Sequence, residues 1–311
     1  MQAHPAGLAP TAQPASSAPD RQGMELGLRQ AIAQGAFHLH WQPIVHCLTG
    51  RLHRFEALVR WDRPGTGPVS PDTFAAVAEV LGLHRGLDLW VMRHAMAEAA
   101  LWPKTIGVAI NVSALWFHSD ELSRHVEALL DETGLDPGRL ELEVTEHAFI
   151  GDSPAAIREF SRLRALGVGL SLDDFGTGYS ALSYLRTLAF TTLKLDRAFV
   201  EGLGRCSRTE VITRAVLAMG TGLGMLVCAE GVSDPGQLAI LQTYGCGEAQ
   251  GFLIGRPGPM TPGRMAAWMR PDRGSLFHRP DLAAKPGAAC AAPAQPATAQ
   301  PAADKPAADK P

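Results

Sequence analysis

Short apolar runs alternate with longer segments of helical pattern along most of this chain, and this alternation limits the fold more than any other feature. Eight runs of strand length lie at 38–45, 54–61, 106–113, 140–145, 168–173, 192–196, 226–230 and 250–254. Expected helices lie between them at 71–81, 87–101, 119–133, 153–166, 208–219 and 235–243. Strands that are separated by helices normally pair in parallel, so the pattern predicts an α/β barrel closed by eight strands.

The two ends of the chain differ in composition from the part between them. Residues 1–22 and 271–311 are rich in alanine and proline and hold few large apolar side chains. Such segments bury too little apolar surface to offset the entropy lost on ordering, which predicts two disordered tails. Residues 23–270 are expected to form one domain, close to the roughly 250 residues typical of a single (β/α)8 barrel.

The alternation of side chains along the expected strands separates an apolar face from a polar one. The apolar face carries residues such as Val108, Ile110 and Val112, and we expect it to pack against the helices. The second face is expected to point into the barrel; it comprises Glu56, Leu58, Arg60, Ala109, Asn111, Ser113, Glu141, Glu143, Thr145, Gly169, Ser171, Asp173, Thr192, Lys194, Asp196, Cys228 and Glu230.

The inward face holds more acids than bases, although burying an unpaired carboxylate costs several kcal/mol. Each acid taken alone is more often structural, but the same parity recurs on six strands. Lys194 and Arg60 cannot neutralise all of these acids, which indicates bound cations. Oxygen ligands without histidine or cysteine favour Mg²⁺ or Mn²⁺ over zinc or copper. The residues alone therefore predict a divalent-metal enzyme at the C-terminal ends of the strands, with phosphate chemistry as the leading hypothesis.

Composition limits the setting in which such an enzyme would work. The formal net charge is −3 and the cysteines number 5, widely scattered and without a CxxC pair. We therefore expect no attraction to a nucleic-acid polymer, no disulfide framework and no thiolate zinc site. No run reaches the roughly 18 to 20 apolar residues of a membrane span. A cytoplasmic protein without membrane association is the expectation.

A set of ordered motifs covers nearly the whole expected domain. These are FEALVRW at 55–61, INVS at 110–113, ELEVTE at 141–146, DDFGTGYSAL at 173–182, LKLD at 193–196, AEGV at 229–232 and QGFLIGRP at 250–257. In order and spacing they resemble the EAL domain family of cyclic di-GMP phosphodiesterases. The resemblance implies a modified TIM (β/α)8 barrel with an antiparallel first strand, and hydrolysis of cyclic di-GMP to linear pGpG.

The resemblance also assigns roles to single residues. It places Glu56, Asn111, Glu143 and Asp173 on a first divalent ion, Mg²⁺ or Mn²⁺, with Asp173 bridging to a second ion held by Asp174. Lys194 and Glu230 match the positions that hold and deprotonate the attacking water, and which of them takes the proton stays open. Substrate contacts are implied for Gln42, Leu58, Arg60 and Gln250. Glu146 matches the glutamate that steadies the loop after Asp174.

Three functions remain open at this point, and the first is favoured. They are an active phosphodiesterase, a receptor that binds cyclic di-GMP without cleaving it, and an interaction module that has lost the ligand. The glutamate of the EAL triplet, the paired aspartates and the lysine are all present, which favours catalysis. Ser233, where many members have a second glutamate, is the departure that bears most on the rate. Members often dimerise, which implies a homodimer, and a regulatory protein partner stays unknown.

Overall fold

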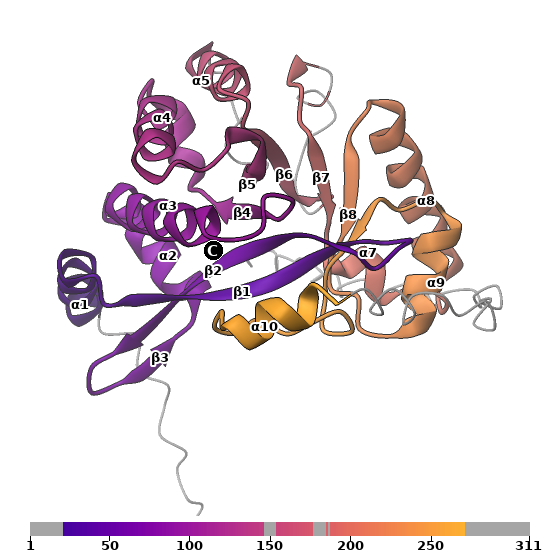
Figure 1. Cartoon of the computed structure of the whole chain (residues 1–311), viewed down its shortest axis with the longest axis horizontal. Coiled ribbons are helices and arrows are strands. Elements are labelled where there is room, and N and C mark those ends of the chain that lie inside the picture. The colour runs from indigo at the N-terminus through magenta and orange to yellow at the C-terminus, as the bar shows by residue number, and fades with distance from the viewer. Residues whose placement is uncertain (1–20, 146–153, 177–184, 186, 271–311) are drawn as a thin grey trace, which may run out of the picture.

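The computed structural model describes residues 21–145, 154–176, 185 and 187–270 (Figure 1). Its strands are β1 (Phe37–His46), β2 (Leu52–Arg63), β3 (Gly67–Val69), β4 (Gly107–Asn111), β5 (Leu140–Thr145), β6 (Gly169–Phe175), β7 (Thr192–Leu195), β8 (Leu226–Ala229) and β9 (Glu248–Ala249). They form one sheet in the order β1-β9-β8-β7-β6-β5-β4-β2-β3, and an additional pairing of β1 with β2 closes it into a barrel.

The direction of β1 distinguishes this barrel from a regular one. β1 pairs antiparallel with both β2 and β9, whereas the pairings from β2 through β4 to β9 are parallel. The predicted modified barrel with an antiparallel first strand is thus confirmed. Because β1 and β2 are also long, they form a hairpin whose inner face runs beyond the ends of the shorter parallel strands.

Helices surround the barrel on its outside (Figure 1). They are α1 (Arg21–Gln34), α2 (Pro71–Val80), α3 (His84–Ala100), α4 (Leu122–Thr133), α5 (Pro154–Ala165), α7 (Arg197–Glu201), α8 (Ser207–Gly222), α9 (Pro235–Thr243) and α10 (Pro262–Trp268), with the 3-10 turns η1 (Ala114–His118) and η2 (Pro137–Arg139). No helix in these described ranges has both the length and the apolar character needed to cross a bilayer.

The expected parity holds on the central strands. Outer-face residues such as Leu142, Leu170 and Leu193 belong to the main apolar core, which the helices share. Inside the barrel, Ile44, Ala109 and Cys228 form a separate small apolar cluster. Polar inner-face residues lie on either side of this cluster along the strands. The barrel interior therefore contains two polar layers separated by an apolar one.

Several local expectations differ from the structure, and the short helices α7 and α10 were among the elements not expected. Helix α1 was not expected, although Met24, Leu28 and Ala31 are buried at helical spacing and it begins within the segment 1–22 assigned to a tail. The short strand β3 was also missed. The expected strand at 250–254 is wrong, because β9 ends at Ala249 and the chain turns there. Asp196 does not face the barrel interior: it follows β7, and its carboxylate caps α7 by accepting from the Ala198 backbone N–H.

Candidate active site

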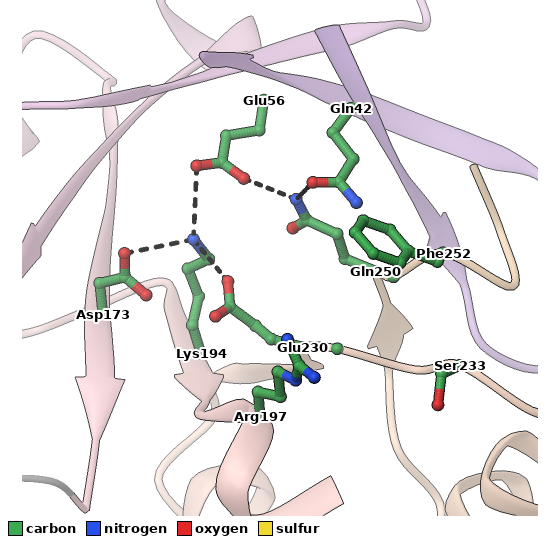
Figure 2. A pocket seen from close by; sticks show the side chains of 11 residues that line it. Gln42, Glu56, Asp173, Lys194, Arg197, Glu230, Ser233, Gln250 and Phe252 are labelled. Carbon is green, nitrogen blue, oxygen red and sulfur yellow. Dashed lines mark hydrogen bonds and ion pairs between the residues drawn. The ribbon is translucent and has the colours of Figure 1, made fainter. Parts of the chain in front are cut away.

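A buried lysine lies at the centre of the upper polar layer of the barrel, which is the layer nearer the C-terminal ends of the parallel strands. Lys194, on β7, places its Nζ 2.7 Å from Glu143 Oε2. The same Nζ lies 2.7 Å from Glu230 Oε1, 3.3 Å from Asp173 Oδ2 and 3.9 Å from Glu56 Oε1 (Figure 2). These acids come from β5, β6 and β2 and from the residue after β8. One ammonium group therefore faces four carboxyl groups, so the predicted excess of acid in this layer is present.

Four of the predicted metal ligands lie side by side on adjacent strands. Asn111 and Glu143 are register partners of β4 and β5, and Asn111 Nδ2 donates to Glu56 Oε1 at 2.6 Å. Glu143 is 1% exposed, and its Oε1 is buried without a hydrogen-bond partner in the described part of the chain. A buried carboxylate oxygen normally has a partner, so this atom is suited to a ligand that the protein itself does not supply.

The paired aspartates are separated by an irregularity in β6. The pairing register of β6 with β7 shifts between Leu172 and Phe175, which is where Asp173 and Asp174 lie. Asp173 is buried, whereas Asp174 is exposed and has a left-handed φ of 54°, the only such value among non-glycine residues in the described ranges. Aspartate tolerates this conformation better than most residues. Both carboxylates and that of Glu230 still present oxygens within 4.8 Å of one another, close enough to hold one cation.

Burial and charge shift the proton affinities of this group. Burial raises the pKa of Glu143 well above its usual value, and burial raises the pKa of Glu230 to about 7 against the opposing effect of Lys194. Burial alone would lower the pKa of Lys194, but the surrounding carboxylates raise it well above its usual value. Lys194 is therefore charged, and the acids around it compete for its single charge.

A second network of buried ion pairs occupies the lower polar layer, nearer the N-terminal ends of the parallel strands. It shows that the charge count made from the sequence omitted a base. Arg54, on β2, is an inward-facing base that the count left out. Its guanidinium forms ion pairs with Glu141 and with Glu248, the latter at 3.0 Å. The hydroxyl of Thr192 donates to Glu141 Oε2 at 2.7 Å. Glu141 is thus neutralised by protein groups, and the uncompensated acids are confined to the upper layer.

A pocket of about 280 Å³ opens above Lys194. Its lining comprises Gln42, Glu56, Asp173, Lys194, Arg197, Glu230, Gly231, Ser233, Gln250, Gly251 and Phe252 (Figure 2). Gln250 Nε2 donates to Gln42 Oε1 at 3.1 Å and to Glu56 Oε2 at 2.6 Å, which ties these two predicted substrate contacts to the acid cluster. Leu58 and Arg60 are half-buried further along the same face of β2, outside this lining.

Some site residues were not identified from the sequence or cannot be placed. Phe252 and Arg197 line the pocket, although neither received a role. The available signal was position: Phe252 lies within the motif QGFLIGRP, and Arg197 directly follows the motif LKLD. Glu146 lies outside the described residues, so its predicted contact with the loop after Asp174 stays a prediction. Ser233 bonds Gln237 through its N–H at 2.8 Å and its hydroxyl at 3.2 Å, so it closes the first turn of α9.

The sequence matches the model of the EAL domain over residues 26–257. The chain belongs to the EAL domain family. In this EAL domain the triplet that gives the family its name is Glu56–Ala57–Leu58 on β2, with Glu56 buried in the acid cluster and Ala57 on the outer face.

Known EAL proteins similar to this chain include two from Pseudomonas aeruginosa that are named cyclic di-GMP phosphodiesterase. PA2567 is 40% identical over 78% of this chain and 42% of its own length, and NbdA is 42% identical over 76% of this chain and 31% of its own length. The structure of the PaMucR phosphodiesterase in complex with c-di-GMP superposes with a TM-score of 0.72 at 38% identity, covering 76% of this chain and 98% of that one. The chain spans less than half the length of the curated relatives PA2567 and NbdA.

Proposed function

We propose that this EAL domain hydrolyses cyclic di-GMP to linear pGpG with the help of two divalent cations, Mg²⁺ or Mn²⁺. The observation that carries the proposal is the cluster of four carboxyl groups around a single buried ammonium group at the C-terminal ends of the strands. Relatives of known name at about 40% identity point to the same substrate and reaction. The residues in the cluster supply the chemistry that hydrolysis of a phosphodiester needs.

The donor set fits divalent cations that prefer oxygen. Glu56, Asn111, Glu143 and Asp173 would hold the first ion. The buried Glu143 Oε1, which has no hydrogen-bond partner among the described residues, supports this assignment. Asp173, bridging, and Asp174 would hold the second, beside Glu230. When bound, such ions stabilise negative charge on a phosphoryl group and increase the acidity of water. The two cations would also balance the negative charge of the carboxylates, which Lys194 alone does not neutralise.

Lys194 and Glu230 divide the handling of the attacking water between them. The side chain of Lys194 is 3% exposed, and its Nζ lies within 3.3 Å of carboxylate oxygens of Glu143, Glu230 and Asp173. The side chain of Glu230 is 20% exposed and lines the pocket. We therefore assign the proton-accepting role to Glu230 and the orienting role to Lys194. A base with a pKa near the working pH is also the more effective one.

A substrate would be held above the cluster by the neighbouring polar side chains. Gln42 and Gln250 line the pocket on the side of β1 and β9. Arg60, further out on β2, is proposed to meet a phosphate oxygen, since its planar fork of donors suits phosphate geometry. Leu58 lies on the same face of β2 and is proposed to contact the nucleoside.

The proposal is tested by turnover of cyclic di-GMP to pGpG, followed by chromatography with Mg²⁺, with Mn²⁺ and with EDTA. We expect turnover only with a metal, and we expect Glu56→Ala to abolish it. Glu127→Ala, which removes an exposed acid on α4, is the matched control and should keep full activity. Tight binding without turnover in either metal would select a receptor instead, and absence of binding would select an interaction module.

Two further expectations from the sequence stay predictions. A homodimer is tested by light scattering coupled to size-exclusion chromatography. Cytoplasmic location is tested by fractionation of cells that express the full gene. A regulatory protein partner remains to be identified.

A further inference from the structure

A small pocket opens at the opposite end of the barrel from the acid cluster. Its volume is about 210 Å³, and its lining includes the first residues of five consecutive parallel strands: Gly107, Leu140, Gly169, Thr192 and Leu226. It therefore lies at the floor of the barrel, where the lower polar layer meets the outside. Pockets for drug-sized ligands have roughly 300 to 1,000 Å³, so this floor pocket suits a smaller ligand.

Basic side chains outnumber acids in the lining of the floor pocket. The bases are Arg54, Arg139, Arg164 and His53, and the acid is Glu141. Glu141 forms an ion pair with Arg54. Glu248, outside the lining, contacts both Arg54 and His53. Because these two bases are engaged by acids, the excess of positive charge comes from Arg139 and Arg164.

In the part of the chain that the structure describes, Arg139 and Arg164 bond to backbone carbonyls and form no ion pair. Arg139, in η2, donates from Nε to the Ile106 carbonyl at 2.8 Å and from Nη2 to the Ala99 carbonyl at 2.6 Å. Arg164, in the last turn of α5, donates from Nη1 to the Val168 carbonyl at 2.6 Å. A guanidinium has more N–H donors than these bonds use, so each group keeps donors for a ligand.

Both guanidinium groups are also partly withdrawn from water. Arg139 and Arg164 are half-buried, and burial lowers the pKa of Arg139 against a smaller opposing effect of Asp136. A cation that loses water without gaining an acid is destabilised. An anion bound in the floor pocket would restore the balance of charge.

We propose that the floor pocket binds a phosphate dianion on Arg139 and Arg164, either inorganic phosphate or the terminal phosphate of a phosphomonoester. The planar fork of a guanidinium matches the spacing of phosphate oxygens, and a pair of such groups balances the charge of a dianion. A bound dianion would also join η2 to the end of α5, and binding to the folded state raises stability. This site is separate from the acid cluster and does not depend on the proposed hydrolysis.

The test is calorimetric titration of the full chain with inorganic phosphate, in EDTA and at constant ionic strength. We expect one saturable site per chain. We expect binding to weaken about tenfold or more in Arg139→Gln and in Arg164→Gln, because each loses a charge-assisted contact. Arg162→Gln, in the same last turn of α5 but outside the lining, is the matched control and should bind within about twofold of wild type.

A lysine variant separates loss of charge from loss of structure. Arg164→Lys keeps the charge without the planar fork, so it should bind phosphate at least about threefold more tightly than Arg164→Gln. Thermal unfolding without phosphate shows whether each variant is folded. The unfolding temperature of wild type should rise with phosphate and not with chloride at the same ionic strength.

Competing ligands identify the source of the phosphate group. Displacement of inorganic phosphate by GMP would select a phosphomonoester, and failure of GMP to compete would select the free ion. Dimethyl phosphate, a monoanion, should not compete in either case. Absence of saturable binding, unchanged binding in both folded glutamine variants, or loss of binding in Arg60→Gln instead would overturn the proposal. The last result would place the anion in the active-site region.

Discussion

Lys194 is a buried base that contacts four acidic side chains. Its ammonium group is shared by Glu56, Glu143, Asp173 and Glu230. Removing one partner of a buried charge group leaves the others without compensation. Lys194 therefore balances part of the negative charge of these carboxylates, and the proposed cations would balance the rest.

The Lys194→Met variant tests this reading. We expect turnover to fall at least about 100-fold, because the attacking water loses its orienting group. We also expect the metal-free protein to unfold at a lower temperature, and added Mg²⁺ or Mn²⁺ to raise that temperature more in the variant than in wild type. Thermal unfolding with and without metal measures this difference. An equal response to metal in both proteins would show that the cations do not enter the carboxylate cluster.

Asp174 combines a proposed ligand with a left-handed backbone, and two substitutions separate these roles. Asp174→Asn keeps a residue that tolerates φ near 54°, so its stability should stay within about 0.5 kcal/mol of wild type. Asp174→Ala should lose about 1 kcal/mol, because alanine tolerates that conformation less well. Both should bind metal at least about tenfold more weakly. Urea unfolding and metal titration give the two readouts, and equal stability of the two variants would contradict the backbone argument.

Between elements, one aspartate connects helix α3 to the chain that follows β4. Asp88 Oδ2 accepts from the Ser113 backbone N–H at 3.0 Å and from Trp116 Nε1 at 2.8 Å. Ser113 and Trp116 follow the strand that ends at Asn111, so this link fixes the chain just beyond a proposed ligand. Burial raises the pKa of Asp88 to about 7. The charged carboxylate is consequently less favoured in the folded state than in the unfolded one.

This shift predicts how stability depends on pH. Between the ordinary aspartate pKa and about 7, the folded protein binds more protons at Asp88 than the unfolded chain does, so stability at this site falls as pH rises. Asp88→Asn keeps an acceptor and does not ionise. Its stability relative to wild type should rise between pH 5 and pH 8 by about 2 kcal/mol or more. Urea unfolding of both proteins across this range measures the difference, and a constant difference would show that Asp88 ionises normally.

Across the whole molecule, the two ends of the barrel perform different tasks. The lower layer satisfies its charges within the protein through Arg54, Glu141 and Glu248, whereas the upper layer leaves acids for cations. Residues at the N-terminal face of such barrels generally serve stability, and those at the C-terminal face serve catalysis. The apolar cluster of Ile44, Ala109 and Cys228 keeps the two charged layers apart.

The Arg54→Met variant tests the division between the two ends. It leaves Glu141 and Glu248 without their buried counter-charge, and we expect a loss of about 3 to 5 kcal/mol in the free energy of unfolding. At a temperature where the variant is folded, kcat should change less than about threefold. Arg51→Met, an exposed arginine before the same strand, is the control. A loss of kcat that exceeds the loss of folded protein would show that the layers are coupled.

The closed barrel and its helices also predict which part of the chain folds. Residues 21–270 contain the described strands and the helix α1, whose Leu28 is fully buried. We expect this fragment to match the full chain in thermal unfolding and in kcat. A fragment that starts at residue 36 lacks α1 and should be clearly less stable. Lower activity of the 21–270 fragment would assign a role to the flanking segments.

The sequence predicts the position of a site residue only where the local strand pattern decides the direction of its side chain. The parity of the strands predicted that Glu56, Glu143, Asp173 and Lys194 share one space, and the structure brings them together. Asp196 had the right parity but lies one residue beyond its strand, where a capping hydrogen bond decides its direction. Phe252 was placed in a strand, but the chain turns there, because the backbone N–H groups of Ile254 and Gly255 both donate to the Gly251 carbonyl.

The sequence by itself determined the barrel, its apolar and polar faces and most of the buried acids, because strand periodicity and motif order are properties of neighbours along the chain. The tertiary structure alone decided how the charges are shared. Arg54 meets Glu141 and Glu248 across the barrel, and Lys194 gathers carboxylates from four other segments of the chain. Electrostatic energy depends on distance in space and on burial, and neither can be obtained from separation in sequence.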